Sequence, residues 1–197
     1  TTLYNALLQT GIEIIEVKKH TLPVRYVPLA LDAMVAEGIS DLKFKNTSLY
    51  PLFIKTYSTK DDVTVEIYSH DLDGITYKTR SETIKELPAL KDIIKKDVNK
   101  EYQDKVLFEG EYYRLTYPRG GYIAKAYLQT YKDGKLVEEK EIRNETYKPQ
   151  NGIIIEGAEK APENLKTIED TVTSAETYTH GININNENYT IPSNICP

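Results

Sequence analysis

The sequence predicts an α+β protein that is predominantly β: a short N-terminal helix packed on an antiparallel meander, followed by a small elongated three-stranded β module. Composition is the first reason, because 16 tyrosines, 3 phenylalanines and no tryptophan, with many Val, Ile and Thr residues, favour strands over helices. Alternation of apolar and polar residues in several short stretches is the second. Helical spacing of apolar residues at the N-terminus is the third.

The N-terminal part begins with the predicted helix. Residues 1–10 carry apolar side chains at helical spacing, and Gly11 follows in a position suited to a left-handed C-terminal residue. Residues 12–17 then alternate apolar and charged side chains, which predicts a half-buried strand. Over residues 22–46, short apolar groups separated by prolines and a glycine predict short strands and turns.

A β-hairpin is predicted next, because residues 52–57 and 63–68 both alternate and a polar turn lies between them. A turn at residues 71–74 leads into a further strand, which Leu87 and Pro88 end. The aspartates of this turn resemble the start of a calcium loop but lack its later ligands, so we interpret them as a turn. The first domain therefore closes near residue 88.

The remaining chain is predicted to hold a second, thinner module. Residues 89–104 have few apolar anchors and suit either a linker, which we favour, or one marginal helix. Three alternating stretches separated by glycine turns then predict a three-stranded sheet over residues 112–142. The expected divisions are a first domain at 1–88, a linker at 89–104, a β module at 105–158 and a polar tail at 159–197.

Charge and cysteine content exclude several classes of function. The net charge is -5 and no long basic run is present, so we expect no nucleic-acid partner. A single cysteine, Cys196, excludes an intrachain disulfide and a cysteine-built zinc site, and the three histidines have no zinc spacing, so we expect neither metal nor cofactor. No apolar window approaches the roughly 18 residues of a membrane span, so membrane contact would come only through upstream segments.

Residues 1–46 carry a specific family pattern. It consists of Thr1-Thr2-Leu3-Tyr4-Asn5, Gly11, His20, Pro23, Val24, Tyr26, Pro28, Asp32-Ala33, Val35, Asp41, Phe44 and Asn46. In this order and spacing, the segment resembles the C-terminal half of the VanW domain, found in exported bacterial proteins including one encoded in vancomycin-resistance clusters.

Two departures from the VanW pattern matter. Ala30 stands where the family usually has glycine, which affects the local turn if that residue needs a positive φ. The family also carries a Gly-Gly-Gly-Val-Cys-Gln-Val-Ser-like stretch directly before the Thr-Thr pair, and this chain starts after it. Because the chain also lacks an initiating Met, we expect it to be a fragment or a processed product.

Glycines mark the second resemblance. Residues 105–157, with Gly110, Gly120-Gly121, Gly134, Pro149 and Gly157, resemble the G-five domain, a β module of Gram-positive surface proteins. Together the two resemblances imply an extracytoplasmic location at the bacterial cell wall or cell surface. They also imply peptidoglycan or another wall polysaccharide as the partner.

His20 and Asp32 are the candidate catalytic pair. With the family's upstream cysteine they would form a nucleophile, base and orienting acid, and so a thiol acyl-transfer site acting on peptidoglycan stems. This chain, without the cysteine, would then be inactive. The alternative is structural, with His20 closing a turn and Asp32 bonding local backbone amides. Thr1 as an N-terminal nucleophile is a further, weaker hypothesis.

Tyrosines are the candidate ligand-binding residues. Tyr112, Tyr122 and Tyr127 could form a platform on which sugar rings stack, although on alternating strands about half of such residues simply face the core. Our leading interpretation is a non-catalytic module that binds or spaces at the cell wall. The alternative is a peptidoglycan-modifying thiol enzyme whose nucleophile lies upstream of this chain.

Overall fold

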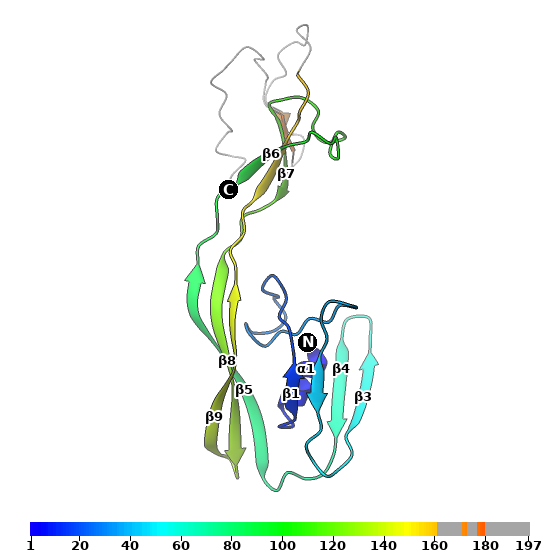
Figure 1. The fold of residues 1–197 in the computed structure, drawn as a ribbon, viewed down its shortest axis with the longest axis vertical. Coiled ribbons are helices and arrows are strands. Elements are labelled where there is room, and N and C mark those ends of the chain that lie inside the picture. The colour runs from blue at the N-terminus through cyan, green and yellow to red at the C-terminus, as the bar shows by residue number, and fades with distance from the viewer. Residues whose placement is uncertain (161–170, 173–176, 180–197) are drawn as a thin grey trace. The chain divides into compact units, whose positions relative to one another are not determined.

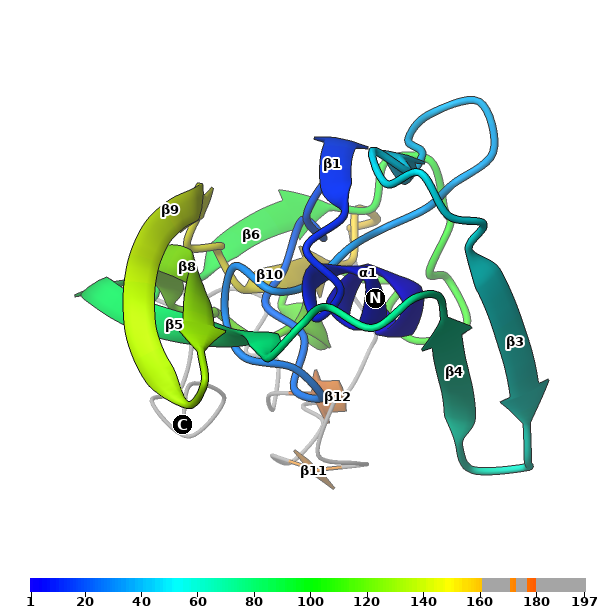
Figure 2. The same ribbon diagram turned by 90° about the horizontal axis from the view of Figure 1, so that it is seen from below.

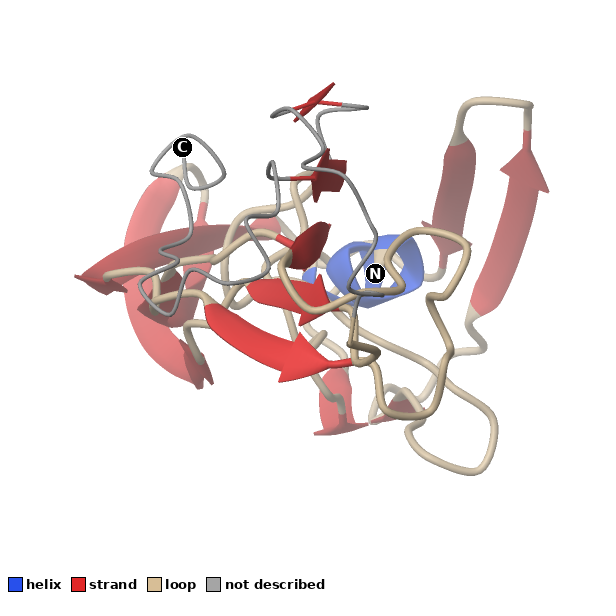
Figure 3. Cartoon of the chain, turned by 90° about the horizontal axis from the view of Figure 1, so that it is seen from above, coloured by secondary structure: helices blue, strands red, loops and turns tan. Residues whose placement is uncertain are grey.

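The structure, a computed structural model, describes residues 1–160, 171–172 and 177–179 (Figure 1). The helix and strands are α1 (Thr2–Leu8), β1 (Glu13–Glu16), β2 (Lys43–Lys45), β3 (Phe53–Ser58), β4 (Val63–Tyr68), β5 (Ile75–Leu87), β6 (Ile93–Lys96), β7 (Glu111–Thr116), β8 (Gly121–Lys132), β9 (Lys135–Tyr147), β10 (Ile153–Glu156), β11 (Thr171–Val172) and β12 (Thr177–Thr179). The predicted class is confirmed, because the described chain is predominantly β with a short N-terminal helix (Figure 3).

By contacts the chain forms two compact units. The first comprises Thr1–Leu87 and Gly121–Lys148, and the second comprises Pro88–Gly120 and Pro149–Pro197. The first unit contains α1 and the sheets β1-β2, β3-β4 and β5-β8-β9. The second unit contains one sheet in the order β11-β12-β7-β10-β6. Within the described residues, no helix is long and apolar enough to span a membrane.

The helix forms as the N-terminal spacing predicts. Tyr4, Leu7 and Leu8 are its buried residues, which are three and four positions apart and therefore share one face. Gly11 has a φ of +71°, which confirms the predicted left-handed residue after the helix. A Cβ at Gly11 would lie 2.4 Å from Cζ of Tyr77, so only glycine allows the Tyr77 ring to approach this turn.

Two predicted hairpins are confirmed. Strands β3 and β4 pair from Phe53 opposite Tyr68 to Ser58 opposite Val63. Strands β8 and β9 are joined by Asp133 and Gly134, whose φ values of +49° and +78° fit the left-handed turn that Asp-Gly favours between antiparallel strands.

The predicted three-stranded sheet is wrong in one of its strands, because the strand that pairs with β8 on the side away from β9 is not the predicted one. We expected β7 beside β8, but β7 pairs with β10 and β12, and β5 takes the place beside β8. The longer ladder explains this outcome, since β5 has 13 residues and β7 has 6. Strand β8 is therefore part of the first unit, which also contains the N-terminal helix α1.

The core of the first unit lies between α1 and the sheet β5-β8-β9. In Figure 2, α1 lies between this sheet and the hairpin β3-β4. Ala124 and Ala126 of β8 are fully buried, and their small side chains let Tyr4 and Leu8 of α1 pack close to the sheet. The loop residues Ala30, Leu31 and Ala33 complete the cluster.

The second unit is held by its own buried groups. Ile154 is fully buried, and Arg114 forms an ion pair with Asp92 at 2.8 Å with only 1% of the Arg114 side chain exposed. Strand β6 lies inside the segment 89–104 and pairs with β10 in parallel. The predicted limits at residues 88, 104 and 158 stay a prediction, and most of the predicted tail 159–197 lies outside the described residues.

Candidate functional site

The structure brings His20 and Asp32 together. Nδ1 of His20 lies 2.9 Å from Oδ2 of Asp32, and the backbone N–H of His20 donates to the same oxygen at 2.6 Å. The Asp32 side chain is 2% exposed and that of His20 is 28% exposed. A buried carboxylate thus holds a histidine ring whose other nitrogen is available.

Asp32 is also the centre of a wider network. The hydroxyl of Tyr147 donates to Oδ1 of Asp32 and accepts the N–H of Ala30 at 3.0 Å. Arg143 donates to the carbonyl oxygen of Asp32 at 2.5 Å. Burial alone would raise the pKa of Asp32, but the hydrogen bonds from Tyr147 and His20 and the charge of Arg143 outweigh it and lower the pKa. Asp32 is therefore ionised, and Nδ1 of His20 donates to it.

Thr1 holds the start of α1 beside this network. Its hydroxyl donates to the carbonyl of Ala33 at 3.0 Å and accepts the N–H of Ala33 at 3.1 Å. Ala33 follows Asp32 directly, so the helix start and the His20–Asp32 pair lie in one region. Since the hydroxyl hydrogen is engaged with a carbonyl, the geometry does not favour Thr1 as a free nucleophile.

Sequence reasoning missed Tyr147 and Arg143. Both stand on β9, more than 110 positions after Asp32 in the chain, and no local motif marks them. The geometry explains the departure at position 30. Ala30 has a φ of +63° and is fully buried, so alanine here adopts the left-handed conformation that glycine would adopt with less strain.

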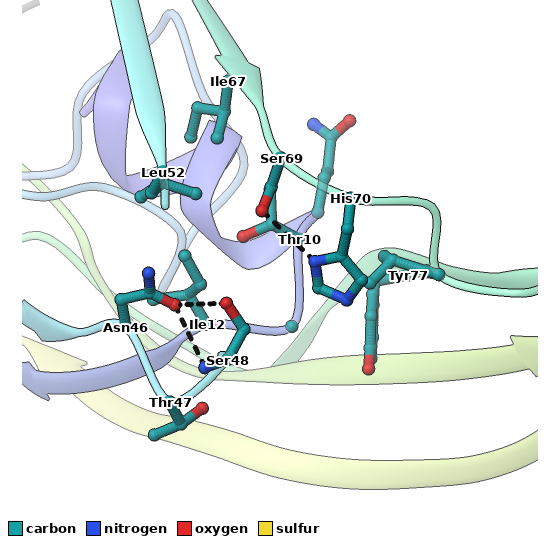
Figure 4. Close-up of a pocket in the computed structure, with 13 residues that line it drawn as sticks. Thr10, Ile12, Asn46, Thr47, Ser48, Leu52, Ile67, Ser69, His70 and Tyr77 are labelled. Atoms are coloured by element: carbon teal, nitrogen blue, oxygen red, sulfur yellow. Dashed lines mark hydrogen bonds between the residues drawn. The ribbon is translucent and has the colours of Figure 1, made fainter. Parts of the chain in front are cut away.

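A second candidate site is a pocket of about 320 Å³ in the first unit, which we call the His70 pocket (Figure 4). Its lining residues are Gln9, Thr10, Gly11, Ile12, Asn46, Thr47, Ser48, Leu52, Ile67, Ser69, His70, Leu72 and Tyr77. None of the 13 is Asp, Glu, Lys or Arg, although 28% of the chain is charged. The pocket therefore offers neutral polar groups beside apolar side chains.

The polar groups of the His70 pocket are held in place by the loops that carry them. Oδ1 of Asn46 accepts the backbone N–H and the hydroxyl of Ser48 at 3.1 and 2.8 Å. The hydroxyl of Ser69 donates to the carbonyl of Pro51 at 3.1 Å and lies 3.2 Å from Nδ1 of His70. Because the Ser69 hydrogen is used, Nδ1 of His70 carries the proton and Nε2 remains an acceptor.

The three tyrosines predicted to bind a ligand belong to two different units. Tyr112 belongs to the second unit, is 5% exposed and lies 3.3 Å from Oε1 of Glu156 through its hydroxyl. Tyr122 and Tyr127 belong to β8 of the first unit and are half-buried, and the Tyr127 ring is covered by Arg80 at 4.1 Å. Their role as ligand-binding residues stays a prediction.

The comparisons with known proteins bear on the N-terminal part. Residues 1–68 match the family model described as VanW like protein. The uncharacterized protein YoaR of Bacillus subtilis (strain 168) is 29% identical over 101 residues, which are 51% of this chain and 31% of YoaR. The chain thus spans about a third of that curated relative.

Two solved structures are similar to part of the chain. The crystal structure of HP0197-G5 is 24% identical and covers 42% of this chain and 97% of its own, with a TM-score of 0.21. The IgA1 protease G5 domain is 17% identical and covers 44% of this chain and 94% of its own, with a TM-score of 0.26. The VanW resemblance expected from the sequence is thus found again in the family-model match over residues 1–68.

Proposed function

We propose that this chain is a wall-binding part of a bacterial cell-envelope protein and that its His70 pocket holds an uncharged sugar unit of a wall polysaccharide. The observation that carries this proposal is the charge-free lining of the pocket. An uncharged sugar presents hydroxyl and amide groups, which neutral donors and acceptors bind without burying an unpaired charge.

The shape of the pocket supports the same ligand. Its volume of about 320 Å³ lies at the lower end of the range of small-molecule sites. Ile12, Leu52 and Ile67 supply apolar surface for the C–H face of a sugar ring, while Nε2 of His70 accepts a hydroxyl hydrogen. His70 is further fixed by stacking on Tyr50, with ring centroids 4.4 Å apart.

The test is calorimetric titration with chitotriose, a neutral oligomer of N-acetylglucosamine. Replacing His70→Ala removes one acceptor worth about 1 kcal/mol and is expected to weaken binding about five- to tenfold. His20→Ala is the matched control, since it removes a histidine outside the pocket and is expected to leave the affinity unchanged. Equal affinity in both variants, or no binding of chitotriose or purified wall by the parent protein, would contradict the proposal.

The His20–Asp32 contact favours a second candidate, a thiol acyl-transferase acting on wall peptides. Asp32 holds Nδ1 of His20, which leaves Nε2 as a base for a cysteine thiol supplied from upstream of Thr1, as the VanW resemblance implies. The thiolate would attack an acyl carbonyl, the leaving amine would take the proton from His20, and a second amine or water would release the acyl group.

This candidate is tested with an upstream-extended protein incubated with peptidoglycan, followed by mass spectrometry of the digested fragments. Altered stems or cross-links that vanish in His20→Ala would support catalysis. Unchanged fragments, with both proteins pelleting with the wall, would leave His20 and Asp32 a structural role.

A further inference from the structure

A second cleft of the first unit runs between two strands that do not pair with each other. It has a volume of about 880 Å³ and is lined by residues 11–18, which include β1, and by residues 140–145 of β9. We call it the β1–β9 cleft. Both linings are continuous runs, and because successive side chains of a strand point to opposite faces, a continuous run lines a cleft with its edge rather than with a face. The backbone therefore forms much of the cleft wall.

Both walls of the cleft are open strand edges within the described residues. Strand β1 pairs with β2 on one side only, and β9 lies at the edge of the sheet β5-β8-β9. No backbone hydrogen bond links β1 to β9. An edge presents N–H and C=O groups that another extended chain can pair with. Here two such edges line the same opening.

The two sheets also cover the same hydrophobic core. Ile14 of β1 and Ile142 of β9 are both half-buried and pack against the cluster that contains α1. Tyr4 and Leu8 of α1 and Leu128 of β8 add further apolar surface at the cleft. One further strand between β1 and β9 would therefore join the two sheets and cover apolar side chains that are now only half-buried.

We propose that the β1–β9 cleft binds an extended peptide segment as an additional strand. The backbone of the peptide pairs with the edges of β1 and β9, and its alternate side chains are apolar and point toward α1. The charged residues along the cleft have both signs, including Glu13, Lys18 and Lys140, so a peptide without strong net charge fits it best. The cleft shares only Gly11 and Ile12 with the His70 pocket, so the inference does not depend on sugar binding.

The experiment uses the whole chain and a synthetic capped octapeptide with alternating valine and threonine between a terminal lysine and a terminal glutamate. Hydrogen exchange followed by mass spectrometry is measured with and without the peptide. We expect residues 13–16 and 140–145 to gain protection together, by at least tenfold, because both edges acquire partners. The matched control is the same peptide with alternate amides N-methylated, which keeps the side chains but removes the donors, and it is expected to give no protection.

A pair of protein variants provides a second measurement. Ile142→Asp places a charge at the cleft and is expected to weaken peptide binding at least tenfold, while Ile84→Asp changes an exposed isoleucine on β5 and is expected to have no effect. His70→Ala is expected to bind the peptide normally, which separates this inference from the proposed function. Equal protection by the N-methylated peptide would overturn the proposal. So would protection confined to β3 and β4, or protection of both cleft edges caused by dimerisation without peptide.

Discussion

Replacing Tyr147→Phe tests the network around Asp32 most directly. The variant keeps the buried ring and removes only the hydroxyl, which donates to Asp32 and accepts the N–H of Ala30. A hydrogen bond to a charged group contributes about 1.5–3 kcal/mol, and a buried N–H left unpaired costs about 1–3 kcal/mol. Because the loop can relax around the lost hydroxyl, we expect a net loss of about 3 kcal/mol in the free energy of unfolding at pH 7.

The loss should depend on pH with a definite sign. The folded-state pKa of Asp32 is lowered, so its contribution to stability is present above the ordinary pKa of 3.8 and disappears as the pH falls through the lowered folded value. In the variant one of the groups that lower this pKa is gone. The stability difference between the two proteins should therefore be constant near pH 7 and shrink as the pH falls through the folded-state pKa of Asp32 in the variant toward the lower value in the parent.

The assay is urea unfolding followed by circular dichroism, with hydrogen exchange of residues 30–33 to assign the change to the first unit. Tyr131→Phe is the matched control, because its hydroxyl donates to Gln129 at 3.1 Å outside the Asp32 network, and we expect a loss below about 1 kcal/mol. A loss below about 1 kcal/mol for Tyr147→Phe, or a difference independent of pH, would refute the assigned role of the hydroxyl.

Three other predictions follow from the described geometry. Ala30→Val places a branched side chain at a φ of +63° and should cost more than about 2 kcal/mol in urea unfolding, while Ala30→Gly should change stability by less than about 1 kcal/mol; similar values for both would contradict the left-handed assignment. Gly157→Ala puts a Cβ 2.3 Å from the carbonyl oxygen of Phe108, so residues 153–156 should lose exchange protection, and unchanged protection would contradict this close approach. Hydrogen bonding by Arg80 lowers the pKa of Glu139 to about 2, so its carboxyl should stay ionised at pH 3 in an NMR titration and should titrate nearer its ordinary 4.5 in Arg80→Ala; an unchanged titration in that variant would exclude the cause.

Local patterns predicted local structure well. The helix that ends before Gly11, the hairpin of β3 and β4 and the turn at Asp133-Gly134 each depend on residues close together in sequence. The pairing of β8 with β5 was missed, because strand partners are chosen by ladder length and by burial against α1, which alternation does not encode.

In the candidate sites, too, the residues marked by a local sequence pattern were predicted, and those brought together by tertiary structure were not. The family pattern marked His20 and Asp32, and the structure places them in contact. Tyr147 joins them from β9 through tertiary structure alone. The His70 pocket was also missed, because the histidine is isolated in the sequence and the pocket is defined by the charges that its lining lacks. The lack of charged residues is spread over several separate segments of the chain, so it leaves no motif in the sequence.

The division of the first unit into two stretches of chain has a consequence for biosynthesis. The carboxylate of Asp32 meets the Tyr147 hydroxyl 115 residues later, so at a translation rate of about 5–20 residues per second the ribosome needs roughly 6–23 seconds to supply it. For most of that interval, until β8 (Gly121–Lys132) has been made, the N-terminal stretch lacks the strand against which α1 packs. During synthesis the apolar face of α1 is therefore exposed to solvent. Chaperones that bind such surface would bind residues 1–87 before the rest of the chain is made.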